Sequence, residues 1–251
     1  MKRFGTHGIL IRTYEKDAAR LGFCLASIAR FCSGFDDVVI VCQEKAVEFI
    51  RPIVNASPVG RLKICPAYEN DYIGQQITKL RATDYIDTDY ICHVDSDCVF
   101  FEAFKPQDYF FDDKPAMYYK DYDWFYRQKH LNPWQFITSR LMNRQVDYEF
   151  MALFPLIYPK ELYKDLEAWF VEANGYTYEE LEAKLIIPNQ VSEFNLMGAF
   201  SYYEGGGKYH TFLDWGENPI KHYLKQYCTD AWVDREISDE EYEELRRTVG
   251  Q

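Results

Sequence analysis

The sequence has the size and composition of an ordinary globular chain with an acidic surface. Its 251 residues, 47% hydrophobic and 27% charged, can bury the core of one large α/β domain. The formal net charge of −12 argues against a general nucleic-acid binder and against electrostatic docking on an anionic membrane, since both need a basic face. Without repeats or Pro/Gly/Ser-rich linkers, a single domain is the simplest expectation.

Cysteine usage and the N-terminus bear on the cellular compartment. The seven cysteines are odd in number and include no C-x-x-C pair, which indicates neither a disulfide framework nor a zinc ribbon. Residues 1–5 lack the apolar stretch of a signal peptide, and no segment approaches the ~20 apolar residues of a membrane span. We therefore expect a cytoplasmic protein.

Strands and helices alternate through the first hundred residues. Short apolar runs predict buried strands over residues 8–11, 37–42 and 90–94, and residues 61–65 are expected to form a further strand. Three helices are predicted between these strands. The first places Leu21, Leu25, Ile28 and Cys32 on one face, the second covers residues 44–50, and the third covers about 74–83. The second of these helices is expected to end at Pro52. This alternation predicts a parallel, doubly wound sheet, in which ligands bind beyond the carboxyl ends of the strands.

The second half of the chain is less regular. The predicted elements are a strand over 148–154, a helix over 161–171 closed by Asn174-Gly175, and two helices started by the capping pairs Thr177/Glu180 and Ser238/Glu241. Three glycines, 205–207, predict a flexible turn that lacks the strand-before, helix-after context of a phosphate loop.

Three D-x-D triplets occur, at residues 87–89, 95–97 and 121–123. Only Asp95-Ser96-Asp97 directly follows a predicted buried strand and precedes another apolar run. Carboxylates two residues apart at a strand end can point to the same side, toward one hard divalent cation such as Mn²⁺ or Mg²⁺. Such a cation would bridge diphosphate oxygens and offset the charge on a leaving nucleoside diphosphate.

One segment, between Trp124 and Val146, runs against the acidic trend. It contains no acidic residue, and aromatic side chains alternate with its bases, which are Arg127, Lys129, His130, Arg140 and Arg144. The segment is either a solvated basic surface or a channel for an anionic acceptor, such as a phosphorylated glycan or a nucleic-acid strand.

Four segments together resemble glycosyltransferases of the GT-A type. Residues 75–97, which run from QQITKL through an apolar strand to HVDSD, look like the K-L, strand and D-S-D arrangement of these enzymes. The likeness is greatest to small bacterial and viral members and more distant to glycogenin-like enzymes. Residues 11–17 resemble the strand-end T-Y segment, 192–196 the S-E-[FY] segment and 219–223 the late K-H segment.

The resemblance implies a fold, a reaction and partners. The fold is one Rossmann-like GT-A domain over 1–251, with a mainly parallel sheet flanked by helices. Its nucleotide-binding half is 1–105, and its acceptor-side half is 106–251 with the C-terminal helix. The reaction moves a sugar from a nucleoside-diphosphate sugar, UDP-linked as is common in D-x-D enzymes, to an acceptor hydroxyl. The acceptor is a glycan or lipid-linked saccharide, or a modified DNA base reached through Arg127, Lys129, Arg140 and Arg144.

The resemblance also assigns residue roles. Asp97 binds the metal, Asp95 binds the metal or the ribose, and His222 completes the metal shell, with His210 as its competitor. The contacts to the nucleotide sugar are assigned to Thr13, Tyr14, Asp17, Gln76, Lys79, Asp95 and Ser96. Glu193 is the expected general base of an inverting transfer. In a retaining enzyme it would only position the acceptor.

Three other functions compete with this interpretation. Asp95 and Asp97 fit the D-x-D-x-[TV] signature of haloacid-dehalogenase-type phosphatases, but that family places it on its first strand and needs a later G-D-x-x-x-D segment, which is absent here. A nucleotidyltransferase would need a Gly-rich loop where residues 12–16 stand. A non-catalytic sugar- or nucleotide-binding module would bind nucleotide without turnover.

Overall fold

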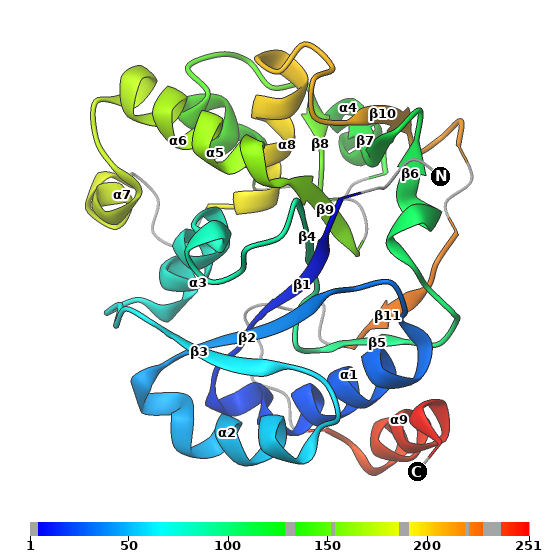
Figure 1. Cartoon of the computed structure of the whole chain (residues 1–251). Helices are drawn as coiled ribbons and strands as arrows, with labels where there is room; N and C mark the ends of the chain where they lie inside the picture. The colour runs from blue at the N-terminus through cyan, green and yellow to red at the C-terminus, as the bar shows by residue number, and fades with distance from the viewer. Residues whose placement is uncertain are drawn as a thin grey trace. The chain divides into compact units, whose positions relative to one another are not determined.

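The computed structural model describes residues 5–128, 134–151, 154–185, 191–218, 221–227 and 237–250. The fold is mixed α/β, with a mostly parallel sheet flanked by helices (Figure 1). The chain forms two compact units, each assembled from separate segments. Unit 1 comprises Met1–Ala67, Tyr85–Asp108 and Lys221–Gln251, and unit 2 comprises Tyr68–Asp84 and Tyr109–Ile220.

Unit 1 is built on a parallel sheet with the strand order β3-β2-β1-β4. The strands are β1 (His7–Arg12), β2 (Asp37–Gln43), β3 (Arg61–Cys65) and β4 (Tyr90–His93). Every residue of β1 is buried, and Ile9 lies between Val38 and Cys92 in the register. The four strands predicted in this half of the sequence are confirmed. Three of them, β1, β2 and β4, are apolar runs buried inside the sheet, whereas β3 lies at its edge and is mostly exposed.

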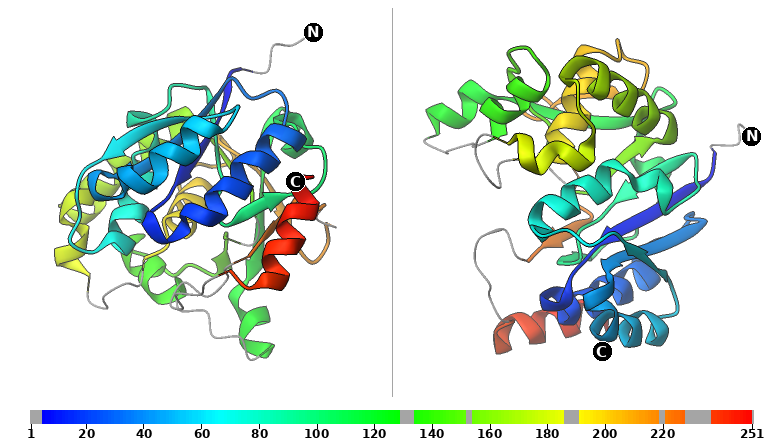
Figure 2. Two further views of the ribbon diagram at one scale, coloured as in Figure 1. Left: turned by 90° about the horizontal axis from the view of Figure 1, so that it is seen from below. Right: turned by 90° about the vertical axis from the view of Figure 1, so that its left-hand side faces the viewer.

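Two helices of unit 1, α1 (Ala18–Phe31) and α2 (Val47–Ala56), pack against each other and cover one face of this sheet (Figure 2). The predicted end of the second helix at Pro52 is wrong, since α2 continues to Ala56. Proline removes one helical hydrogen bond. Ile50 and Val54, on either side of Pro52, are nevertheless buried, and that packing holds the last turn in place.

The chain returns to unit 1 for its last segment. There β11 (Leu224–Gln226) pairs antiparallel with β5 (Cys98–Phe100), and α9 (Asp239–Val249) packs on α1. The predicted cap of the final helix is confirmed, because Ser238 Oγ accepts a hydrogen bond from Glu241 N at 3.2 Å. Glu241 Oε1 also lies 3.3 Å from Arg20 Nε in a buried ion pair that joins α9 to α1.

Unit 2 surrounds a central buried helix. Its strands are β6 (Phe110–Phe111), β7 (Lys114–Asp121), β8 (Tyr148–Glu149), β9 (Leu156–Pro159) and β10 (Thr211–Asp214). Its helices are α3 (Asp71–Leu80), α4 (Tyr122–Arg127), α5 (Trp134–Leu141), α6 (Lys160–Asn174), α7 (Leu181–Lys184) and α8 (Glu193–Tyr203). Helices α3, α5 and α6 all contact α8, which is buried from Glu193 to Ser201. A helix covered on all sides lacks a polar face, so no amphipathic pattern marks it in the sequence.

In this half of the chain the predicted helix caps are correct, whereas the predicted strand is too long. Gly175 ends α6 with a left-handed φ of 75°, and the capping box of Thr177 with Glu180 is present, so both predictions are confirmed. The strand predicted over 148–154 is too long, because β8 stops at Glu149. The next backbone N–H, that of Phe150, donates to Asn195 Oδ1 at 2.8 Å instead of continuing a ladder.

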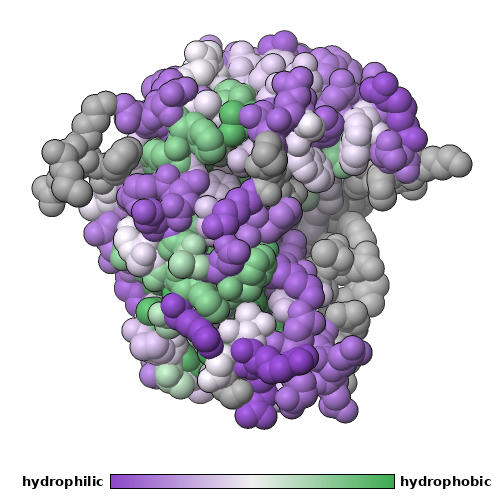
Figure 3. Space-filling model, turned by 90° about the vertical axis from the view of Figure 1, so that its right-hand side faces the viewer, coloured by the Kyte–Doolittle hydropathy of each residue, from purple (hydrophilic) through white to green (hydrophobic). Residues whose placement is uncertain are grey.

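The surface combines hydrophilic and apolar areas. On the face shown in Figure 3, hydrophilic residues predominate and apolar ones gather in patches between them. Among the described residues, no helix is both long enough and apolar enough to cross a membrane.

Candidate carboxylate site and buried ion pair

The Asp95-Ser96-Asp97 triplet forms the turn between β4 and β5 in unit 1. Asp95 is half-buried, whereas Ser96 and Asp97 are buried. Asp95 O accepts from Cys98 N at 3.0 Å and closes the turn, while Asp97 O accepts from Tyr227 N at 3.0 Å. Backbone contacts therefore hold both aspartates at the carboxyl end of β4, where a parallel sheet places its ligand site.

Asp17, in the short helix η1 (Glu15–Asp17) that follows β1, joins this turn. Ser96 Oγ donates to Asp17 Oδ2 at 2.6 Å. Burial raises the pKa of Asp17 and the charge of Asp95 raises it further, while hydrogen bonds from Ser96 and Tyr14 and the charge of Arg20 lower it. The Asp17 and Asp95 carboxylates therefore share one electrostatic environment, as the prediction of a common site requires.

Two buried thiols lie beside these carboxylates. Cys24 Sγ lies 3.8 Å from Asp95 O, and Cys98 Sγ lies 3.9 Å from Asp97 Oδ1. Burial raises the pKa of both thiols well above the ordinary value, and the charges of Asp97 and Asp95 raise it further. Both shifts favour the protonated thiol over the thiolate.

Thr13 occupies the end of β1. Its backbone N–H donates to Val41 O at 2.9 Å, and its side chain is fully buried. Within the described part of the chain, Thr13 Oγ1 has no hydrogen-bond partner. A nucleotide at the surface would therefore not reach the buried Thr13 side chain, a contact that the prediction requires. Tyr14, by contrast, is half-buried and reaches solvent.

The predicted metal shell is only partly assembled. The described ranges contain no group of three or more His, Cys, Asp or Glu side chains arranged to hold a metal ion. Asp95, Asp97 and His222 therefore do not form such a group. His222 is exposed, and its neighbour Lys221 pairs with Glu102 at 2.8 Å. Mg²⁺ is commonly bound by one or two carboxylates, with substrate phosphates and waters as its other ligands. Asp95 and Asp97 are the residues of this turn that could hold such a cation.

His210, the alternative metal ligand, is an interior residue of unit 2. Its Nδ1 lies 2.7 Å from Ser201 Oγ and its Nε2 lies 2.9 Å from Ile157 O. Burial lowers the pKa of His210 to about 4. Because both ring nitrogens already have hydrogen-bond partners, His210 serves the structure of this unit.

Three other predicted site residues meet in the interior of unit 2. Lys79 Nζ lies 2.9 Å from Glu193 Oε1, and both side chains are nearly inaccessible, with exposed fractions of 5% and 3%. Gln76 Oε1 accepts from Glu193 N at 3.1 Å, and Lys79 Nζ lies 4.7 Å from the centre of the Phe194 ring. The sequence predicts separate roles for Lys79 and Glu193, at a phosphate and at the acceptor. The structure joins them in one buried ion pair.

A second buried polar network, which sequence reasoning missed, surrounds Asn195. Asn195 Nδ2 donates to Glu149 Oε1 at 2.7 Å and to Ser192 Oγ at 3.2 Å. Ser192 caps α8 by accepting from Asn195 N at 3.2 Å. The only available signal was the presence of polar residues within an apolar stretch, which does not identify their partners.

Comparison with known protein families adds one finding. Residues 7–196 match the profile of a family described as a family of unknown function, DUF6492. The chain belongs to this family. The matched region includes the Asp95–Asp97 turn and the Lys79–Glu193 pair, and it ends before His210 and His222. No curated protein matches the sequence.

The basic segment also lies within the family match. Arg127 Nε donates to Asp123 O inside α4, and Arg144 pairs with Glu204 at 3.6 Å. Arg140 is exposed, while Lys129 and His130 lie outside the described residues. Two of the three described arginines thus already contact groups of this chain.

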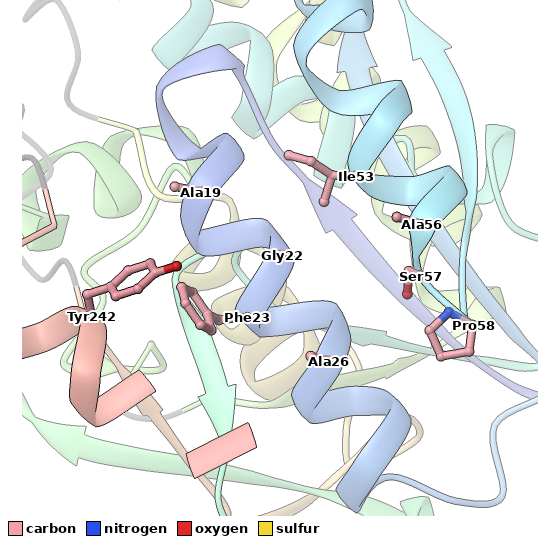
Figure 4. Close-up of a pocket in the computed structure, with 9 residues that line it drawn as sticks. All are labelled: Ala19, Gly22, Phe23, Ala26, Ile53, Ala56, Ser57, Pro58 and Tyr242. Atoms are coloured by element: carbon pink, nitrogen blue, oxygen red, sulfur yellow. The ribbon is translucent and has the colours of Figure 1, made fainter. Parts of the chain in front are cut away.

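A separate cavity in unit 1 is apolar. It has a volume of about 450 Å³ and lies among α1, α2 and α9, with Phe23 and Tyr242 at one side and Ile53 at the other (Figure 4). Among the described residues that line it, the only polar side-chain groups are the hydroxyls of Ser57 and Tyr242. Because none of these residues carries a carboxylate, this cavity is distinct from the Asp95–Asp97 turn.

Proposed function

We propose that the chain is a metal-dependent glycosyltransferase that transfers a sugar from a nucleoside-diphosphate sugar, UDP-linked by preference, to an acceptor hydroxyl. The observation that carries the proposal is the position of the Asp95–Asp97 turn at the carboxyl end of β4, with Asp17, after β1, bonded to Ser96 of that turn. The mostly parallel sheet supports it, since ligands of such sheets bind at this edge. The GT-A form of the fold is part of the proposal.

The charge of the site supports a requirement for metal. The carboxylates at this turn repel a diphosphate, and a divalent cation between the two would offset that repulsion. Asp95 and Asp97 would hold Mn²⁺ or Mg²⁺, which supplies charge stabilisation for the leaving diphosphate. Ser96 and Tyr14 would orient Asp17, through the hydrogen bonds that they already make to it.

Glu193 is the proposed base of an inverting transfer. In that step a Glu193 oxygen takes the proton of the acceptor hydroxyl, whose oxygen bonds to the anomeric carbon as the bond to the diphosphate breaks. A base must lie within hydrogen-bonding reach of the proton it removes. Glu193 would therefore exchange its contact with Lys79 for the acceptor. Substitution Glu193→Gln should abolish turnover and leave nucleotide binding intact, when measured at a temperature where the variant is folded.

Thermal unfolding with nucleotides tests the donor site. UDP, GDP, CDP and dTDP are each added with and without Mn²⁺ to the wild type, to Asp97→Asn and to Asp87→Asn. The last variant is the matched control, because Asp87 belongs to another D-x-D triplet and is exposed. We expect one nucleotide to raise the midpoint only with Mn²⁺, in the wild type and in Asp87→Asn but not in Asp97→Asn.

Two outcomes count against the proposal. A shift that persists in Asp97→Asn would remove the Asp95–Asp97 turn from the binding site. The absence of a shift with all four nucleotides would refute the donor class. Hydrolysis of p-nitrophenyl phosphate, abolished by Asp95→Asn, would then favour the phosphatase alternative.

A further inference from the structure

Four tyrosines of unit 2 form a cluster at its surface, termed here the tyrosine cluster: Tyr119 of β7, Tyr148 of β8, and Tyr202 and Tyr203 at the end of α8. The ring centres of Tyr119 and Tyr148 are 5.0 Å apart, and those of Tyr148 and Tyr202 are 5.3 Å apart. Tyr202 also lies 5.8 Å from Tyr119 and 5.0 Å from Tyr203. Three separate elements therefore bring these rings to one place.

The cluster differs from the tyrosines that fill the core of this unit. Tyr158 and Tyr178 are almost completely buried, whereas all four rings of the cluster are half-buried and keep part of their surface in solvent. Beneath them, the fully buried Phe150 lies 5.7 Å from the Tyr202 ring. Phe212 packs on the same ring at 4.9 Å. Two phenylalanine rings thus hold Tyr202, which contacts the other three tyrosines, in position, as a preformed surface requires.

The charges beside the cluster decide between two kinds of ligand. Arg144 stacks over the Tyr203 ring, with its guanidinium carbon 4.0 Å from the ring centre, and pairs with Glu204 at 3.6 Å. Lys120, next to Tyr119 in β7, pairs with Asp214 at 3.0 Å. Each of these two cations is paired with a carboxylate, so in the described part of the chain they add little net positive charge beside the cluster. Nucleic acid needs cations that are available to its phosphates. A neutral polyhydroxylated molecule needs only ring faces and hydrogen-bonding groups.

We propose that the tyrosine cluster binds a neutral carbohydrate, which serves as the acceptor. Tyrosine suits this ligand because its ring face stacks on the apolar face of a sugar while its hydroxyl bonds the polar edge. Assignment of the sugar as acceptor rests on the proposed glycosyl transfer, but its binding does not, since it requires neither nucleotide nor metal. The proposal favours a glycan over a DNA base as the acceptor class.

Saturation-transfer difference NMR with maltohexaose, cellohexaose and chitohexaose tests the proposal without donor or metal. We expect at least one of these neutral oligosaccharides to bind the wild type. Tyr202→Ala should weaken binding by about two- to tenfold, the range of a single aromatic stacking contact. Tyr202→Phe should retain most of the affinity, since it keeps the ring. Tyr242→Ala is the matched control, an exposed tyrosine of α9 in unit 1 that should not change binding.

Four other outcomes would overturn or change the proposals. Absence of binding by all three oligosaccharides at millimolar concentration would overturn the proposal. Unchanged affinity in both Tyr202→Ala and Tyr148→Ala, verified as folded by circular dichroism, would do the same. Binding of oligothymidylate that is lost in these variants would identify the cluster as a nucleic-acid surface instead. Glycan binding without any nucleotide-dependent thermal shift would refute the proposed transferase and leave the carbohydrate site standing.

Discussion

The buried ion pair between Lys79 and Glu193 allows a quantitative test of how unit 2 is stabilised. At 2.9 Å the attraction between the two charges amounts to about 6 kcal/mol for an effective dielectric constant of about 20. Desolvation of each ion costs several kcal/mol, so the net contribution of the pair is much smaller. Removal of one partner leaves the other charge in the interior, and this should lower the free energy of unfolding by about 3–5 kcal/mol.

A double-mutant cycle separates these terms. The variants are Lys79→Met, which retains an unbranched stem beside Phe194, Glu193→Gln, which retains the shape, and the double substitution. Urea unfolding monitored by circular dichroism gives each free energy. We expect the double variant to be more stable than the sum of the single losses predicts, with a coupling energy of about 2 kcal/mol or more.

The matched control is the pair of Lys208 with Asp165, whose atoms approach to 2.6 Å at an exposed position. Lys208→Met should cause a far smaller loss, because solvent screens exposed pairs. The reasoning is refuted if Lys79→Met and Glu193→Gln each cost less than about 1 kcal/mol, or if their effects are simply additive.

Three further predictions concern His210, Gly198 and Asn195 in the interior of the same unit, with Gly22 of unit 1 as a comparison. Burial lowers the pKa of His210 from its ordinary 6.5 to about 4, so the unfolded chain takes up this proton first. Its contribution to stability is therefore complete above pH 6.5, and about 3 kcal/mol of it should be lost as the pH falls toward 4. Urea unfolding across this range should show a smaller pH dependence in His210→Gln, and equal dependence would contradict the assignment. A Cβ at Gly198 would come within 2.3 Å of Phe150 Cβ, so Gly198→Ala should destabilise by about 1–3 kcal/mol. The same change at Gly22, where the nearest atom is 3.8 Å away, should instead stabilise α1 by about 0.5–1 kcal/mol, and similar thermal shifts in both variants would be the adverse result. Asn195→Ala removes the hydrogen bonds to Phe150 N and Glu149 Oε1, so the free energy of unfolding should fall by about 2 kcal/mol or more. A loss near zero in chemical unfolding would show that the network is dispensable.

The sequence alone determined those features that depend on neighbours along the chain. The strands β1, β2 and β4 are continuous apolar runs because both faces of a central parallel strand are buried. Gly175 and Ser238 mark helix ends through bonds within one or two turns. The position of Asp95 and Asp97 directly after β4 also follows from chain order alone, so the order of residues suffices to locate this candidate site.

Tertiary structure alone decided the features that depend on distant segments. The helix α8 carries no amphipathic period because α3, α5 and α6 cover it from different sides. Pro52 fails to end α2 because buried side chains on both sides of it outweigh one lost hydrogen bond. Neither Lys79 nor Glu193 carries a local sign of its partner. Their pairing follows from the packing of α3 against α8, because in an interior of low dielectric constant a charge is stable only beside its counterion.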